Sequence, residues 1–427
     1  MEKIKINPNK LMGSIKVPPS KSLGHRSIIS ASLSKGVSKI SNVQFSKDII
    51  ATIEIMEKLG AKIQRYDDEV IIDGSSMFEN LTDGLELECN ESGSTLRFLI
   101  PVALVKDGTY EFKGKGKLVT RPLKPYYDIF DEKGIEYSTS EGGLPLKIKG
   151  SLKCGVYSLR GDISSQFITG LLFALPLLDG NSKIIITTAL ESKGYIDLTL
   201  DVLKTFGIFI ENEDYKVFNI RGGQSYNSKN FYIEGDYSQG AFYLVAGAIG
   251  CNINCEGLNE ASLQGDKEII NILKKMGCKF EICKSYIKAL PSNTSGIDID
   301  VSQCPDLVPI LAVLASLSKG TTRILNAKRL RIKECDRLSA TASELNKIGA
   351  NITELEDSLI IEGVSGFNGG HVNSHNDHRI VMALAIAATR ASGEIFIDNY
   401  NAIEKSYPNF FDDYIKLGGD IVELNHR

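Results

Sequence analysis

Six long apolar helices are predicted along the chain at a nearly constant interval. Each begins with polar residues, continues as an apolar run and is expected to end at a glycine, because glycine favours the helix C-terminus. These glycines are 70 to 73 residues apart and are Gly36, Gly108, Gly180, Gly250, Gly320 and Gly393. A constant period of this length indicates an internal structural repeat.

A second set of helices, offset from the first, is amphipathic. Apolar residues recur at i and i+3 or i+4, and a glycine and a strand pattern follow, as in INILKKMGCKF and ASELNKIGANI. The glycines that end these helices are Gly60, Gly134, Gly207, Gly277, Gly349 and Gly418. Most continue through a turn into another strand, as in AKIQRYDDEVIIDG.

Each repeat therefore has the order strand–helix–strand–helix–strand–strand, and six repeats account for the 427 residues. A tandem solenoid is the other architecture that a repeated sequence can form. The mixture of strands with long apolar helices favours compact α/β domains instead. A chain of this length is expected to form two or three domains.

The two ends of the chain carry complementary strand patterns. Only one strand pattern, DIVEL, follows Gly419, whereas two, KIKI and SIKV, precede the first helix. We expect the N-terminal strands to complete the sheet of the last repeat. This places residues 1–19 with 235–427 in one domain of three repeats and residues 20–234 in the other. The two crossings, near 19–20 and 234–236, would act as a double hinge.

Composition and charge exclude several classes of function. The net charge is −4, so no general nucleic-acid binding is expected. No apolar run is long enough to span a bilayer, and MEKIKINPNK has no signal-peptide core, so we expect a cytoplasmic protein with no membrane partner. The eight cysteines are expected to be reduced, and their spacing matches no zinc motif, so no metal is expected.

The unusual polar residues lie almost entirely at the predicted helix starts. The stretch Ser20–Gly36 opens with a capping serine and three cations, Lys21, His25 and Arg26. A helix start carries unpaired N–H groups and partial positive charge, so it is suited to binding an anion. Further cations occur near other helix starts, at Arg97, Arg121, Lys333, Arg337, Arg379 and Lys405. Together they predict a shared cleft for ligands with several phosphate or carboxylate groups.

Each of these residues also has an ordinary structural interpretation. A single lysine or arginine at a helix start is usually solvated, Asp306 could be an N-cap, Glu334 a capping or surface acid, and His378 a buried or capping histidine. Repetition in register, not any one residue, supports the functional interpretation. No nucleophile, nucleotide-binding or dinucleotide motif occurs, so catalysis would use cations, carboxylates and geometry without a cofactor.

The whole chain resembles the 5-enolpyruvylshikimate-3-phosphate synthase family. The resemblance is carried, in the family's order and spacing, by KSLGHR, SGSTLR, RPL, GDISSQF, ESKGYID, PD, KECDRL, NDHRIVMA and EKSYP. It implies a two-domain, inside-out α/β fold with three repeats per domain that closes over its substrates. It also implies a glyphosate-binding transferase of the shikimate pathway of aromatic amino-acid biosynthesis. We expect a monomer.

The implied reaction transfers the enolpyruvyl group of phosphoenolpyruvate to the 5-hydroxyl of shikimate 3-phosphate and releases phosphate by addition and elimination. Asp306 would accept the hydroxyl proton. Either Glu334 or Lys21 would protonate the methylene carbon. Both substrates are small molecules with several negative groups, in agreement with the cations at the helix starts.

The resemblance also implies the substrate contacts. Those of shikimate 3-phosphate would be Lys21, Ser22, Arg26, Ser164, Ser165, Gln166, Ser192, Tyr195, Asp306 and Lys333. Those of phosphoenolpyruvate would be Lys21, Gly93, Arg121, Gln166, Arg337, Arg379 and Lys405. Supporting positions would be Asp48, Ser94, Arg97 and His378.

Two other functions fit part of the pattern. The sister enolpyruvyl transferase that acts on UDP-N-acetylglucosamine resembles this fold, but it typically has a loop cysteine and Lys-Asn where Lys21 and Ser22 stand. The corresponding loop here, KGKGKLVTRP, has no cysteine. The second alternative is a non-catalytic anion-binding protein of the same fold, against which stands the presence of Asp306, Glu334 and Lys21 together.

Overall fold

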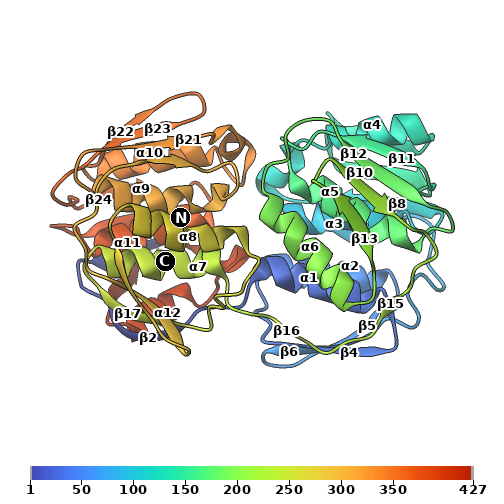
Figure 1. Ribbon diagram of the computed structural model, residues 1–427, viewed down its shortest axis with the longest axis horizontal. Helices are drawn as coiled ribbons and strands as arrows, with labels where there is room; N and C mark the ends of the chain where they lie inside the picture. The colour runs from blue at the N-terminus through green and yellow to red at the C-terminus, as the bar shows by residue number, and fades with distance from the viewer. Residues whose placement is uncertain (1, 425–427) are drawn as a thin grey trace. The chain divides into compact units, whose positions relative to one another are not determined.

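The computed structural model describes residues 2–424, and the chain divides into two compact units (Figure 1). Unit 1 combines the segment up to Pro18 with the segment from Glu234 onward, and unit 2 comprises Pro19–Ile233. Each unit has its own hydrophobic core. No helix within residues 2–424 has the length and apolar character needed to cross a membrane.

In the described part of the chain, six four-stranded sheets share one topology, three in each unit. A strand runs parallel to the strand that follows the buried helix, and a hairpin then adds two antiparallel strands, as in the order β7-β8-β10-β9. The sheets of unit 2 are β16 (Phe231–Tyr232), β4 (Val37–Ser41), β6 (Glu69–Asp73) and β5 (Lys62–Arg65); β7 (Leu85–Glu88), β8 (Gly108–Lys113), β10 (Gly143–Gly150) and β9 (Glu136–Ser140); and β11 (Val156–Leu159), β12 (Ser182–Ile186), β14 (Val217–Ile220) and β13 (Ile210–Glu213). The predicted repeat order is confirmed.

The sheets of unit 1 have the same arrangement. They are β18 (Lys279–Ile282), β19 (Tyr286–Leu290), β17 (Asn252–Glu256) and β2 (Met12–Lys16); β20 (Asp298–Asp300), β21 (Thr321–Leu325), β23 (Leu359–Glu362) and β22 (Asn351–Glu354); and β24 (Gly370–Asn373), β25 (Ile395–Asp398), β1 (Lys3–Asn7) and β26 (Asp420–Leu424). Strand burial alternates, as in β12, so that one face of each sheet packs inward.

The two N-terminal strands join different sheets. β1 lies between β25 and β26 in the last repeat, as expected. β2 instead pairs in parallel with β17 in the fourth repeat, so the expectation that both strands complete the last sheet is wrong for β2. The chain returns to unit 1 directly before α7 (Tyr237–Ala248), the buried helix of the fourth repeat, so among the described residues no strand of that repeat precedes the helix in sequence. β2 takes the place of this strand. In the first repeat β16 supplies the equivalent strand beside β4.

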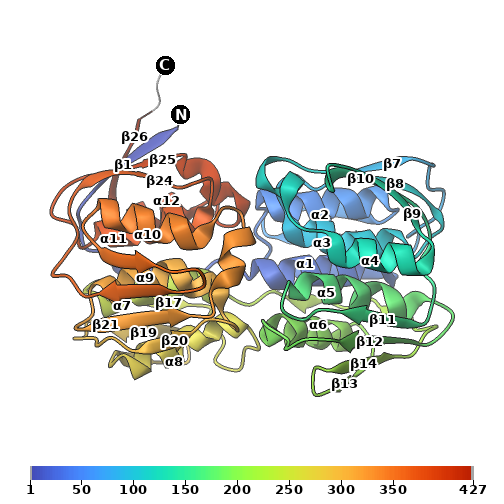
Figure 2. The same ribbon diagram turned by 90° about the horizontal axis from the view of Figure 1, so that it is seen from above.

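The first set of helices forms the interior of each unit, with sheets toward the outside (Figure 2). All residues of α7, α9 and α11 are buried, as expected for helices that are apolar on every side. The helices of this set are α1 (Lys21–Ser32), α3 (Gly93–Ala103), α5 (Ser165–Ala174), α7 (Tyr237–Ala248), α9 (Val308–Ser316) and α11 (His378–Ala388). Their close packing requires a small residue at Gly170, where a Cβ atom would lie 2.4 Å from the carbonyl oxygen of Arg97.

The ends of five helices of the first set differ from the prediction. These helices stop four to six positions before their glycines, because a turn leads from the apolar run to the next strand. α3 ends at Ala103, for example, and Gly108 begins β8. α7 ends as expected, since Gly250, with a φ of 128°, directly follows its cap residue Ile249.

The second set ends as the sequence predicts. These helices are α2 (Lys47–Lys58), α4 (Lys124–Lys133), α6 (Lys193–Thr205), α8 (Glu268–Lys275), α10 (Arg337–Lys347) and α12 (Phe410–Lys416). All six glycines that follow them adopt positive φ angles between 70° and 113°. Glycine is favoured there because a left-handed residue ends a helix at little steric cost.

Candidate active site

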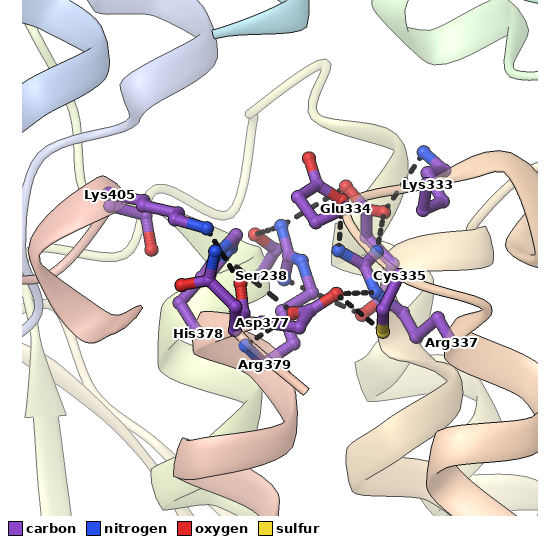
Figure 3. A network of polar contacts seen from close by, with 12 residues as sticks. Ser238, Lys333, Glu334, Cys335, Arg337, Asp377, His378, Arg379 and Lys405 are labelled. Carbon is purple, nitrogen blue, oxygen red and sulfur yellow. Dashed lines mark hydrogen bonds and ion pairs between the residues drawn. The ribbon is translucent and has the colours of Figure 1, made fainter. Parts of the chain in front are cut away.

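In unit 1, α10 begins at Arg337, whose guanidinium group is shared by three carboxylates (Figure 3). Nε donates to Asp377 Oδ2 at 2.8 Å, Nη1 to Asp306 Oδ1 at 2.8 Å and Nη2 to Glu334 Oε2 at 2.5 Å. Only 1 % of the Arg337 surface is exposed. Burial alone would lower the pKa of this group, but the three carboxylates raise it well above its usual value. Arg337 is therefore a fixed positive charge.

Asp306 lies in a 3₁₀ turn, η4 (Pro305–Leu307), directly before α9, and is surrounded by cations. Its Oδ1 accepts from Lys333 Nζ at 3.2 Å as well as from Arg337, and its Oδ2 accepts from Arg379 Nη2 at 3.1 Å. Burial by itself would raise the pKa of the Asp306 carboxyl. Arg379, Lys333 and Arg337 outweigh burial and hold this pKa well below its usual range. Asp306 is thus an ionised carboxylate and not a simple N-cap.

Arg379 and Lys405 are held by the segment that precedes α11. Asp377 caps α11, because its Oδ1 accepts from the backbone N–H of Arg379 at 2.8 Å. The Arg379 guanidinium also donates to Ser238 Oγ at 3.0 Å. Lys405 ends η6 (Tyr400–Lys405) and donates to the carbonyl oxygen of Asn376 at 2.6 Å. Two cations predicted to bind phosphoenolpyruvate therefore depend on one short segment.

In unit 2, Lys21 is the first residue of α1 and pairs with the carboxylate of Asp48 in the first turn of α2, at 2.7 Å. Arg26, one turn further along α1, is buried. It donates to Thr199 Oγ1 and to the backbone oxygens of Ser22 and Tyr195 at 2.8 to 2.9 Å. Burial lowers the pKa of Arg26 to about 10, so the group stays positively charged at neutral pH.

A second group in unit 2 lies at the starts of α3 and α5. Arg97 donates to Gln166 Oε1 at 2.8 Å, and Gln166 Nε2 donates to Ser94 Oγ at 3.0 Å. Arg121 lies against Gly93, where a Cβ atom would come within 2.7 Å of Arg121 Nη1. A side chain at position 93 would therefore push the Arg121 guanidinium group aside.

The remaining predicted contacts also lie at helix starts of unit 2. Ser164 caps α5 by accepting from the N–H of Gln166, and Ser165 is the first residue of that helix. Ser192 precedes α6 with a left-handed φ of 56°. Tyr195, in the first turn of α6, accepts from Arg26 through its carbonyl group. Hydroxyl and N–H groups at these positions are suited to a phosphate or polyol ligand.

One expectation about this region is wrong. The sequence predicts a cation at His25, beside Lys21 and Arg26, but the His25 side chain is buried. Burial, together with the positive charges of Lys21 and Arg26, lowers the pKa of His25 well below its usual value. It is therefore neutral near pH 7. Its Nδ1 pairs with Thr52 Oγ1 at 2.7 Å, inside the helix packing.

Asp377 is a central residue that the predicted site does not include. Its side chain is fully buried, and it links the start of α11 to the Arg337 guanidinium. Its position before a helix indicates a capping role, but the second contact, to a residue 40 positions away, has no local signal. Ser238 is also absent from the predicted site, because its contact with the distant Arg379 has no local signal in the sequence.

Within residues 2–424, no group of three or more His, Cys, Asp or Glu side chains is placed to hold a metal ion. All eight cysteines are free thiols.

Comparisons with known proteins identify the family of this chain. The family model described as EPSP synthase (3-phosphoshikimate 1-carboxyvinyltransferase) matches residues 6–414. The chain belongs to the EPSP synthase family. It is 55% identical to 3-phosphoshikimate 1-carboxyvinyltransferase of Clostridium perfringens, covering 99% of this chain and 100% of that one. The corresponding enzyme of Clostridioides difficile is 54% identical, covering 100% and 99%.

Solved structures support the same family. EPSP synthase of Acinetobacter baumannii matches with a TM-score of 0.82 and 27% identity over 100% of both chains. The enolpyruvyl transferase NikO of Streptomyces tendae matches with a TM-score of 0.81 over 100% and 99% of the chains, but at 17% identity it shows the fold alone.

Burial of neutral His25 predicts a pH-dependent stability. The pKa of His25 is lowered on folding from an unfolded value of about 6.5, so the unfolded chain binds more protons than the folded chain below that pH. His25 should therefore lower the free energy of unfolding as pH falls below about 6.5, by up to about 1.4 kcal/mol per pH unit. Chemical denaturation at pH 7.5 and 5.5 should show a smaller loss in His25→Asn. The exposed His371→Asn should behave as wild type, and equal losses in all three proteins would contradict the assignment.

Proposed function

We propose that this chain transfers the enolpyruvyl group of phosphoenolpyruvate to the 5-hydroxyl of shikimate 3-phosphate and releases phosphate. The main support is the ionised, buried Asp306 held among Lys333, Arg337 and Arg379, in a chain of the EPSP synthase family. The hydroxyl oxygen bonds to the central carbon of phosphoenolpyruvate while Asp306 accepts its proton and the methylene carbon gains one. In the elimination step a proton of the methyl group returns to the group that protonated the methylene carbon. The carbon–oxygen bond to phosphate breaks, and phosphate departs with the proton that Asp306 had accepted.

The cations have a direct role in this proposal. Phosphoenolpyruvate carries a carboxylate and a phosphate on the same carbon, and binding both requires several positive groups that are already in place. We assign this role to Arg337, Arg379 and Lys405 of unit 1 and to Arg121 beside Gly93 of unit 2. Ser22, Arg26 and the serines at the starts of α5 and α6 bind shikimate 3-phosphate, and Lys21 contacts both substrates.

The strong ion pairs of Asp306 explain how such a base can be controlled. A carboxylate with a very low pKa is a weak base, so Asp306 must lose part of its cationic surroundings before it can accept a proton. Phosphoenolpyruvate supplies the competing anions, because it needs the same Arg337 and Arg379. When these cations turn to the substrate, the pKa of Asp306 rises toward the range that a general base requires. The base is therefore activated when the second substrate arrives.

Either Glu334 or Lys21 supplies the proton to the methylene carbon. Glu334 shares Arg337 with Asp306, so a substrate anion that attracts Arg337 affects both carboxylates. Lys21, paired with Asp48, is the other donor. The UDP-N-acetylglucosamine reaction and a non-catalytic anion-binding role are the alternative functions, and the assay below separates all three.

The purified protein should release phosphate from shikimate 3-phosphate and phosphoenolpyruvate, but not when UDP-N-acetylglucosamine replaces shikimate 3-phosphate. Asp306→Ala should lose about 10²- to 10⁴-fold in kcat, the usual contribution of a positioned general base. Calorimetry should show that the variant still binds shikimate 3-phosphate. An unchanged kcat would reject Asp306 as the base, and a wild type active only with the sugar nucleotide would reject the proposed substrate.

Gly93→Ala should impair phosphoenolpyruvate binding and reduce inhibition by glyphosate. The new methyl group would lie 2.7 Å from Arg121 Nη1 and must displace that guanidinium group. We expect the KM for phosphoenolpyruvate to rise several-fold and the inhibition constant of glyphosate, measured as a competitor of phosphoenolpyruvate, to rise more. The KM for shikimate 3-phosphate should stay within about 2-fold, a difference of less than about 0.5 kcal/mol. A wild type insensitive to millimolar glyphosate would count against the assignment.

We infer that the crossings near 19–20 and 234–236 form a double hinge between the domains 1–19 with 235–427 and 20–234, and that a monomer carries out the reaction in the cytoplasm. Roles given to residues of both domains, such as Lys21 and Asp306, support the hinge. Small-angle scattering should show a smaller radius of gyration when shikimate 3-phosphate is added, with shikimate as the control ligand. An unchanged radius would remove the support for closure.

A further inference from the structure

A buried carboxylate outside the predicted site holds the segment that carries two of its cations. Glu344 lies near the end of α10, the helix that begins with Arg337, and its side chain is only 2 % exposed. Its Oε1 is 2.7 Å from Nε2 of His375, and its Oε2 accepts from the backbone N–H of Asn373 at 2.9 Å. Lys347 binds both oxygens at 2.8 Å. Burial would raise the pKa of Glu344, but these three partners lower it, so Glu344 is ionised.

The segment that Glu344 holds has an unusual backbone. His375 and Asn376 adopt consecutive left-handed conformations, with φ of 52° and 57°. Asparagine and histidine adopt this region more often than most residues, but any residue other than glycine does so at a cost that other contacts must compensate. The contact to Glu344 is one. The second is the N–H of His375, which donates to Asn373 Oδ1 at 2.7 Å.

The same segment determines where the cations lie. The carbonyl oxygen of Asn376 accepts from Lys405, and the next residue, Asp377, binds both the N–H of Arg379 and the Arg337 guanidinium. Ser374 adds a link to the chain before η6, because its Oγ donates to the carbonyl oxygen of Asn399 at 2.9 Å. A shift of the His375–Asn376 turn would therefore move the partners of Lys405 and Arg379 together.

From this geometry we propose that Glu344 and His375 are positioning residues for phosphoenolpyruvate binding. Their pairing fixes the left-handed turn before α11. The turn fixes the Asn376 carbonyl group that accepts from Lys405, and the Asp377 carboxylate that accepts from the Arg337 guanidinium group and from the backbone N–H of Arg379. Neither residue contacts the substrate. The claim about substrate binding rests on the proposed function, whereas the claim about the turn rests on unit 1 alone.

Two substitutions of His375 separate its side-chain contact from its backbone conformation. Asparagine tolerates the left-handed backbone but is too short to reach Glu344, whereas glutamine can donate an N–H to that carboxylate. His375→Asn should raise the KM for phosphoenolpyruvate about 10-fold, the cost of one charge-assisted hydrogen bond. Its kcat and its KM for shikimate 3-phosphate should stay within about 2-fold. His375→Gln should be close to wild type, and Glu344→Gln should resemble His375→Asn.

Hydrogen exchange provides a readout that does not depend on activity. Amides of residues 373–379 should exchange faster in His375→Asn than in wild type or His375→Gln. His371→Ala, on β24 with its ring stacked 4.4 Å from Phe396, is the control and should change neither the exchange nor the KM. Unchanged exchange in His375→Asn, or equal increases in both KM values, would overturn the proposal. An inactive wild type with faster exchange in His375→Asn would refute the proposed function and leave the positioning of the turn supported.

Discussion

The burial of Arg337 is the constraint on which the arrangement in unit 1 depends. A guanidinium group that is almost fully removed from water needs charged partners, because an uncompensated buried charge costs several kcal/mol. Asp306, Glu334 and Asp377 supply three negative charges, and Lys333 and Arg379 bring the cations to three. The cluster is therefore close to neutral. Removing any one member would leave another charge without its partner.

This balance also explains why the cluster can respond to a ligand. An anionic substrate that binds Arg337 and Arg379 competes with the carboxylates that already neutralise them, so its binding leaves those carboxylates with fewer cationic partners. Asp306 is the carboxylate whose ion pairs are weakened most, since each of its three cations is shared with another group or lies near the protein surface. In the mechanism that we propose, the electrostatic cost of binding phosphoenolpyruvate is therefore coupled to the basicity of Asp306.

The sequence allowed the repeat, the two sets of helices and the order of elements along each repeat to be predicted, because hydrophobic periodicity and helix-ending glycines are local signals. Long-range pairing left no such signal. Nothing local distinguishes the pairing of β2 with β17 from a pairing with the last sheet. Five of the six apolar helices also end earlier than their glycines, since an αR residue such as Leu104 can cap a helix without a glycine directly after it.

The site shows the same division. Lys21, Arg97, Arg337 and Arg379 could be predicted as site residues, because each lies near a helix start that is marked by a hydroxyl, acidic or glycine residue. The charge state of His25 depended on burial, and the double role of Asp377 depended on a contact across 40 residues. Glu344 looks in the sequence like one half of an ordinary surface pair with Lys347 at i+3. The contacts of Glu344 with His375 and Asn373 arise only in the folded chain. Through them Glu344 holds the segment that leads to Asp377.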